Sequence, residues 1–412
     1  TSPLRETVKR FLSKLLLMVN LFYILFAISF KIKTNFIGDL YLAQILIILI
    51  SINFLFKNSD YLKLFSYEKK ILFLIILWFF NQIISDLVNQ ISFNNSARGT
   101  TKIIITYLSF YSFFKLSKLP NISIVKILLW ICLINILYLF SGYNNYNFIT
   151  GWKFSGGVSI SISLIIFFNL YYKKYLTNNF LLILIFGIGI LSLFFETRYL
   201  FLFNSLLVFY IILFEKFRIN GIIPIVLSSL IFYFFMTNIY EIIIAYELLP
   251  GALLEKQLSQ NSELGILLGG RGEIFASYMA ISDAPIIGHG SWAENCDYIY
   301  LIYDHKIQFN PNIKLDITRC LITSHSVILG SWVNSGIFGF LFWFYIIITM
   351  FKKFIKIIRT RDNSIALFLY LFISLFWDII FSPYGGTRMV YAPLCIVIVL
   401  MHNNQKLTYF KI

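Results

Sequence analysis

Long apolar runs dominate the chain, and short polar segments separate them. A helix needs roughly 20 apolar residues to cross a bilayer, and most of these runs come near that length. The fourth run is short and only three residues separate the seventh from the eighth, so ten or eleven helices are the alternative count. The pattern predicts an all-α integral membrane protein, a polytopic bundle of about 12 transmembrane helices at 11–30, 40–56, 71–91, 103–114, 124–140, 158–172, 180–195, 199–214, 222–236, 327–350, 365–381 and 389–401.

One segment, 237–326, differs in composition, because it carries ten of the 19 acidic residues and three of the four histidines. Within it, 273–283 has the pattern of a short amphipathic helix that stops before Pro285. The predicted organisation is therefore helices 1–9 over residues 1–236, a large outward loop over 237–326, and helices 10–12 over 327–412.

Composition supports this class, since 59% of the residues are hydrophobic and 13% are charged, against about a quarter charged in soluble domains. A net charge of +15 would suggest nucleic acid in a soluble chain. With an inside amino terminus, however, 22 of the 34 basic residues fall in cytoplasmic segments, as the positive-inside bias requires. We therefore expect no nucleic-acid partner, both termini in the cytoplasm of a bacterium, a first helix that is not a removed signal peptide, and a periplasmic loop.

Cysteine use adds little to this map. Cys132 and Cys395 lie in apolar runs, where small core residues are expected. Cys296 and Cys320 both lie in the outward loop, where an oxidising periplasm would permit a disulfide. Pairing and two free thiols are both open from the sequence.

Arg198 is the first candidate for chemistry, because it stands between two apolar runs where an unpaired charge is costly. The alternative is a snorkelling anchor or an ion pair with Glu196. Arg271 is the second, since Gly270 and Gly272 flank it just before a predicted helix that begins at Glu273. Glycines allow a phosphate to approach the free amides at a helix start closely, and a guanidinium there would complete the anion site. The alternative is an arginine in a solvent-exposed turn.

His325 is the third candidate, at the point where the outward loop re-enters the membrane. In the first turn of a helix the imidazole is expected to stay neutral and able to accept a proton, although capping or packing is the alternative. Two further outward arginines, Arg388 and Arg98, would suit an acidic glycan or a second phosphate. Four polar residues inside the runs are expected to make inter-helix hydrogen bonds: Asn81, Gln82, Asp86 and Asp378.

Together these residues describe an interfacial site for a lipid-linked phosphate or diphosphate. Neither a His-Glu-x-x-His motif nor an outer-face Asp-x-Asp is present, and the cysteines lack ligand spacing, so no metal or other cofactor is expected. A nucleophile elbow of the Gly-x-Ser-x-Gly kind is also missing from the sequence.

In their order and spacing, several short motifs resemble the O-antigen polymerase and O-antigen ligase superfamily, whose fold is GT-C-like. The resemblance runs from about 197 to 339, through Arg271-Gly272-Glu273-Ile274, the Pro285-to-Gly290 stretch, His325-Ser326 and the Trp332-to-Gly339 stretch. By this resemblance Arg198, Arg271 and His325 would be catalytic. Gly270, Gly272, Glu273, Arg388 and Arg98 are expected to bind substrate. The chain lacks the serine and glycine that flank the first arginine in that family.

The resemblance implies a metal-independent, inverting glycosyltransferase at the periplasmic face of the inner membrane. Its donor and acceptor would be oligosaccharide on undecaprenyl diphosphate, and a chain-length-determining co-polymerase and a flippase would be its partners. A polymerase fits best. The alternatives are an O-antigen ligase that transfers polymer to lipid A-core, a protein oligosaccharyltransferase and, outside this class, a lipid-linked oligosaccharide flippase.

Overall fold

The structure of the chain is a computed structural model. It describes residues 17–34, 40–56, 63–141, 148–171, 179–195, 197–216, 223, 226–227, 229–230, 234, 272–307, 320–322, 324–360 and 365–401. Arg271 and Gly270, two of the predicted site residues, lie outside the described residues, as do Glu196 and most of the predicted ninth helix.

The described part of the chain is almost entirely helical, which confirms the all-α class. A helix at Leu17–Ser29 comes first. It is followed by β1 (Lys33–Thr34), β2 (Leu40–Tyr41), α2 (Leu42–Leu55), α3 (Ser66–Val88), α4 (Phe93–Leu116), α5 (Ile124–Phe140), α6 (Phe148–Gly151), the π-helical turn η2 (Trp152–Gly156), α7 (Gly157–Tyr171), α8 (Asn179–Phe194), α9 (Arg198–Ile211), the π-helical turn η3 (Ile212–Lys216), α13 (Gly272–Asp283), α14 (Cys296–Ile307), α15 (Val327–Thr360), α16 (Ile365–Phe381) and α17 (Arg388–Met401).

The apolar runs predicted these helices closely: α5 and α16 have the predicted bounds, and α13 begins one residue early. The largest difference is α4, which starts ten residues before the apolar run, because the polar segment from Phe93 onward continues the helix. Sequence reasoning missed α14 and the two-residue strands, which pair in antiparallel fashion.

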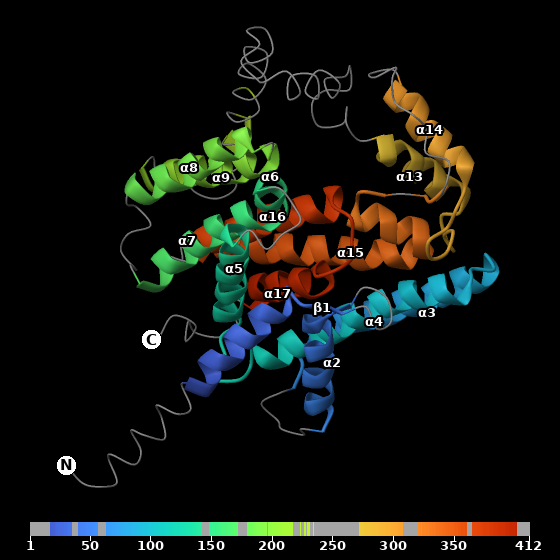
Figure 1. The fold of residues 1–412 in the computed structure, drawn as a ribbon, viewed down its shortest axis with the longest axis horizontal. Coiled ribbons are helices and arrows are strands. Elements are labelled where there is room, and N and C mark those ends of the chain that lie inside the picture. Colours follow the sequence, from blue (N-terminus) through green and yellow to red (C-terminus); the bar gives the residue numbers. More distant parts are fainter. Residues whose placement is uncertain are drawn as a thin grey trace.

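Two helices are long and apolar enough to cross a membrane, Ser66–Val88 and Val327–Ile358, and eight shorter apolar helices of 10–17 residues accompany them. A bundle of twelve spans is therefore not reached within the described residues. The two long helices, α3 and α15, pack on each other, and α3 extends to the right-hand edge of the molecule in Figure 1.

The other helices surround this pair. α4 packs on α3, α2 and α17, while α16 lies between α15 and α9, which carries α8 (Figure 1). One end of the α3–α4 pair is fixed by a buried ion pair, in which Lys118 Nζ lies 2.6 Å from Glu68 Oε2. At the opposite end α13 and α14 pack on the beginning of α15 and form a small core of their own around Ala276, Tyr298 and Val333.

A break in α15 lets the segment 284–291 insert against it. Gly336 has φ 61° and ψ −154°, which is not helical. Carbonyl and amide groups on either side of it therefore form hydrogen bonds outside the helix. The His289 and Gly290 amides donate to the Val333 and Asn334 carbonyls at 2.7 and 3.0 Å, and the Ile337 amide donates to the Ile286 carbonyl at 3.2 Å. The break therefore fixes the segment 284–291 on the bundle.

Candidate functional site

Four of the predicted site residues lie at helix starts. Arg198 is the first residue of α9, Arg388 is the first residue of α17, and Gly272 and Glu273 begin α13. A fifth, His325, comes two residues before α15. Contacts link the starts of α9, α15 and α17 to the ends of α3 and α16, and we call this end of the bundle the outer end.

The end of α16 and the start of α17 form a charged group. Arg388 Nη2 lies 3.7 Å from Asp378 Oδ1, and both side chains are about one-third exposed. The Ser382 hydroxyl donates to Asp378 Oδ1 at 2.7 Å, and Arg388 Nη1 donates to the Pro383 carbonyl at 2.9 Å. The guanidinium is thus oriented while part of it faces solvent, which suits it to bind an anion.

α9 meets this group through Tyr199. The Tyr199 ring stacks on Trp377, with 6.1 Å between ring centroids, and its hydroxyl donates to the Lys153 carbonyl. Trp377 directly precedes Asp378, so this ring contact places the start of α9 next to the charged group. Arg198, the preceding residue, is half-buried at the same end.

The segment before α15 is tied to the same place. The Ser326 hydroxyl donates to the Ile379 carbonyl at 3.3 Å and accepts from the Leu329 amide at 3.2 Å, so Ser326 caps α15 and bonds to α16 next to Asp378. His325 is exposed beside it. The prediction that His325 lies in the first helical turn is wrong, because α15 begins at Val327, after the Ser326 cap.

α13 and α14 are held together by Tyr298. Its hydroxyl donates to Asp283 Oδ2, and its ring meets His289 edge-on with centroids 5.6 Å apart. Burial, with the hydrogen bond to Asp283 second, raises the pKa of Tyr298 to about 12. The phenol therefore keeps its proton and this contact at physiological pH.

A disulfide joins Cys296, the first residue of α14, to Cys320 across 24 residues. The Glu294–Leu321 bridge lies beside it, and the Asn295 amide donates to the Cys320 carbonyl at 2.6 Å. Of the two possibilities that the sequence leaves open, the structure shows the bonded one. The disulfide therefore attaches Cys320, five residues before His325, to the start of α14.

The outer end of α3 carries the polar residues that the sequence marked inside an apolar run. Asp86 is buried; its Oδ1 accepts from the Ser291 amide at 2.6 Å and from Gln82 Nε2 at 2.9 Å, and its Oδ2 accepts from the Ser291 hydroxyl at 3.0 Å. Asn81 donates to the Ser335 carbonyl. The expected inter-helix hydrogen bonding is confirmed for Asn81 and Gln82, which bond to α15, whereas Asp86 bonds to Ser291 in the segment 284–291.

Asp86 is expected to be a structural anchor. We expect Asp86→Ala to lower the free energy of unfolding by about 3 kcal/mol, because three buried donors lose a charged acceptor. Asp297→Ala is the control, since Asp297 is exposed in the first turn of α14 and should cost less than about 1 kcal/mol. Thermal melting of both variants measures this; equal melting temperatures would contradict the assignment.

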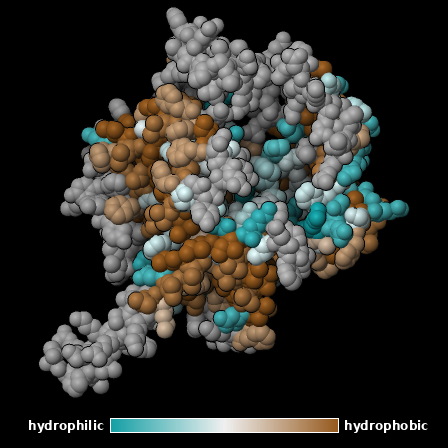
Figure 2. All heavy atoms as spheres, in the orientation of Figure 1, coloured by the Kyte–Doolittle hydropathy of each residue, from teal (hydrophilic) through white to brown (hydrophobic). Residues whose placement is uncertain are grey.

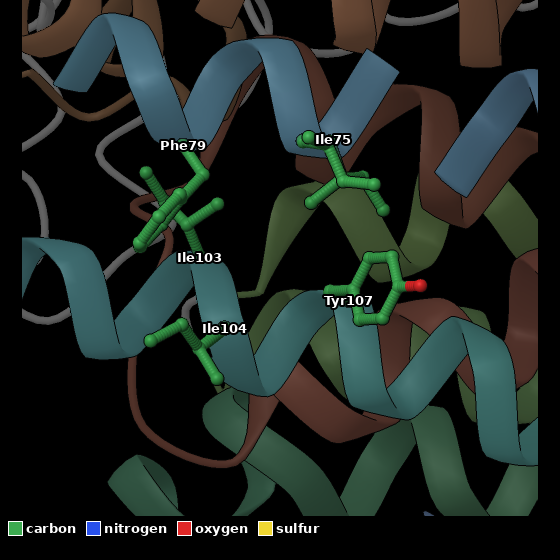
Figure 3. Close-up of a pocket in the computed structure, with 6 residues that line it drawn as sticks. Ile75, Phe79, Ile103, Ile104 and Tyr107 are labelled. Atoms are coloured by element: carbon green, nitrogen blue, oxygen red, sulfur yellow. The ribbon is translucent and has the colours of Figure 1, made fainter. Parts of the chain in front are cut away.

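An apolar groove of about 170 Å³ lies between α3 and α4. Figure 3 shows the side chains of the two helices facing each other across it. It is lined by Ile75, Ile76, Phe79, Ile103, Ile104 and Tyr107. Because this lining has no carboxylate, amine or imidazole, the groove suits a hydrocarbon chain and not a catalytic step.

The residues that the structure brings together are therefore Arg388, Asp378, Tyr199 beside Arg198, and Ser326 beside His325. Arg98 is exposed near the start of α4, at the same end of the bundle but outside this group. Sequence reasoning gave Asp378 only an inter-helix role and missed Tyr199; an acidic residue ten positions before an outward arginine was a signal that could have found the pair. The described residues hold no group of three His, Cys, Asp or Glu side chains that would bind a metal.

Comparison with known proteins adds no assignment. The chain matches no protein-family model and no curated protein.

Proposed function

We propose that this chain spans the inner membrane of a bacterium and polymerises a surface polysaccharide. It would transfer the growing glycan from undecaprenyl diphosphate to another lipid-linked repeat unit at the periplasmic face. The family resemblance in the sequence supplies the substrate class. The site geometry supports a reaction on an anionic, lipid-linked donor.

Exposed apolar surface supports the membrane location. One face of α3 exposes large apolar side chains at helical spacing over its whole length, where a soluble protein would place polar residues: Phe73, Ile76, Phe80, Ile84 and Leu87, from 38% to 73% exposed. Figure 2 shows hydrophobic residues over most of the visible helices, and hydrophilic ones gathered toward α13, α14 and the outer ends of α3 and α4. A bilayer would cover the former and leave the latter in water.

The observation that carries the proposal is the meeting of Arg388, the start of α9 and the Ser326 cap at one place on α16. A diphosphate leaving group gains negative charge as its bond to the sugar breaks, so cations fixed there stabilise the transition state more than the ground state. Arg388 and Arg198 would supply that charge, with Arg271 as a further candidate.

In the proposed reaction the acceptor hydroxyl oxygen forms a bond to the anomeric carbon from the face opposite the diphosphate. The bond between that carbon and the phosphate oxygen breaks, and its electron pair leaves with the diphosphate. The hydroxyl proton passes to His325, which is exposed and directly precedes Ser326, whose hydroxyl bonds to the Ile379 carbonyl of α16. Inversion at the anomeric carbon follows from this single displacement.

A gene deletion examined on a lipopolysaccharide gel tests the proposal. Loss of a polymerase should leave lipid A-core with one repeat unit, and wild-type chain should restore the ladder. Bare core with polymer retained on undecaprenyl diphosphate would instead identify a ligase, and repeat units held on the cytoplasmic side would identify a flippase. Either result overturns the polymerase assignment.

A further inference from the structure

α4 carries a second cationic group, formed by Arg98 and Lys102. The two residues are four apart in the helix and so share one face, where like charges repel by a few tenths of a kcal/mol. Arg98 is exposed and Lys102 is half-buried. Within the part of the chain that the structure describes, neither side chain forms an ion pair with a carboxylate.

Asp86 is a buried carboxylate on α3, which packs on α4, the helix that carries Lys102. Its oxygens already accept hydrogen bonds from Ser291 and Gln82, so it is held for the α3 network. Lys102 therefore has a partly desolvated ammonium without a direct acceptor among the described residues, an arrangement that an incoming anion would relieve.

Contacts on either side of Lys102 fix its position at the outer end. One turn before it, Gly99 packs so closely on Ser291 that a Cβ would lie 1.9 Å from the Ser291 hydroxyl oxygen. One turn after it, the Thr106 hydroxyl lies 2.7 Å from the Tyr384 hydroxyl. Tyr384 belongs to the loop that ends at Arg388, so α4 contacts the connection between α16 and α17 one turn after Lys102; Figure 1 shows α4 and α17 next to each other.

We infer that Arg98 and Lys102 bind the diphosphate of the acceptor, the second lipid-linked substrate. This inference rests on the proposed function, because only a polymerase holds two diphosphates at once. Two such anions repel each other and need separate cations. The acceptor diphosphate does not react, so neutralisation by a lysine ammonium and an exposed arginine is enough, whereas the donor needs the oriented guanidinium of Arg388.

Counting bound lipids on the full-length chain tests the inference without transfer. Native mass spectrometry with undecaprenyl diphosphate should find two lipids on the wild type and one on the double variant Arg98→Gln/Lys102→Gln. Lys102→Arg keeps the charge and should keep both lipids. Lys69→Gln/Lys70→Gln removes two exposed charges from the other end of α3 and is the matched control, also expected to bind two.

One lipid on the wild type, or two on the Arg98→Gln/Lys102→Gln variant, overturns the inference. Undecaprenol, inorganic diphosphate and repeat units that carry acidic sugars distinguish the possible ligands. Undecaprenol should bind equally to wild type and variant. Inorganic diphosphate should compete for the second lipid, whereas loss of binding seen only with an acidic sugar would assign the cations to the glycan and reject the diphosphate site.

Kinetics separate the two substrates. A repeat unit without its acceptor hydroxyl can act only as donor, and one joined to its lipid through a carbon linkage can act only as acceptor. The double variant should raise the KM of the acceptor about tenfold and leave the donor KM nearly unchanged. Equal effects on both would reject the assignment. Two bound lipids without any transfer in the wild type would instead reject the proposed function and leave the binding site standing.

Discussion

Gly336→Ala should lower the free energy of unfolding by about 3 kcal/mol and release the segment 284–291 from α15. The backbone at Gly336 has a positive φ and a ψ of −154°, a combination that costs an L-residue about 1–3 kcal/mol. In addition, an added Cβ would lie 1.9 Å from the Ile286 carbonyl oxygen, which belongs to the backbone and cannot rotate away. The insertion would have to move.

Gly330→Ala in the same helix is the matched control. A Cβ there would meet Ser324 Cβ at 3.5 Å, an ordinary contact, so the variant should be as stable as the wild type or about 0.5–1 kcal/mol more stable. Thermal melting compares the two, and protease cleavage near residue 290 reports release of the insertion. Equal melting of the two variants, with no new cleavage, would show that the break in α15 is not needed.

Sequence periodicity predicted the helices because burial and helix formation depend on nearby residues. The bounds of α5 and α16, and the short helix α13, followed from apolar runs and a proline alone. The break at Gly336 could not be predicted in this way. A glycine in an apolar helix has many uses, and this one depends on a carbonyl 50 positions earlier in the chain.

In the candidate site, too, features set by nearby residues could be predicted, whereas contacts between distant segments could not. Costly charges at the ends of apolar runs mark Arg198, Arg388 and Arg98 from the sequence alone, since membrane energetics is a local property of each run. Their grouping is not local. Arg388 pairs with Asp378 around a tight loop, whereas Asp86 bonds to Ser291 across 205 positions, and nothing in either segment specifies the other.

His325→Ala is the prediction with the largest effect on activity. If His325 takes the acceptor proton, kcat should fall by about 10²- to 10⁴-fold, while the KM of the lipid-linked donor changes little, because the cations and not the imidazole hold the diphosphate. His325 is exposed, so the variant should melt at the wild-type temperature. Turnover of purified chain on synthetic lipid-linked repeat units measures both constants.

His289→Ala gives the opposite pattern and serves as the control. His289 Nε2 donates to the Ala280 carbonyl at 2.6 Å and its ring contacts Tyr298, so the variant should lose about 1 kcal/mol of stability yet keep its kcat per folded molecule. Arg388→Gln completes the comparison, since loss of an oriented guanidinium should raise the donor KM and lower kcat together.

These three variants separate chemistry from scaffolding. A histidine that only caps or packs would change melting and leave kcat alone, as His289→Ala is expected to do. A wild-type kcat for His325→Ala would mean that another residue accepts the proton. Glu273 in the first turn of α13 would then be the next residue to substitute. If Arg388→Gln also kept its kcat and KM, the charged group on α16 would be a structural ion pair, and the glycosyltransferase assignment would lose the observation that carries it.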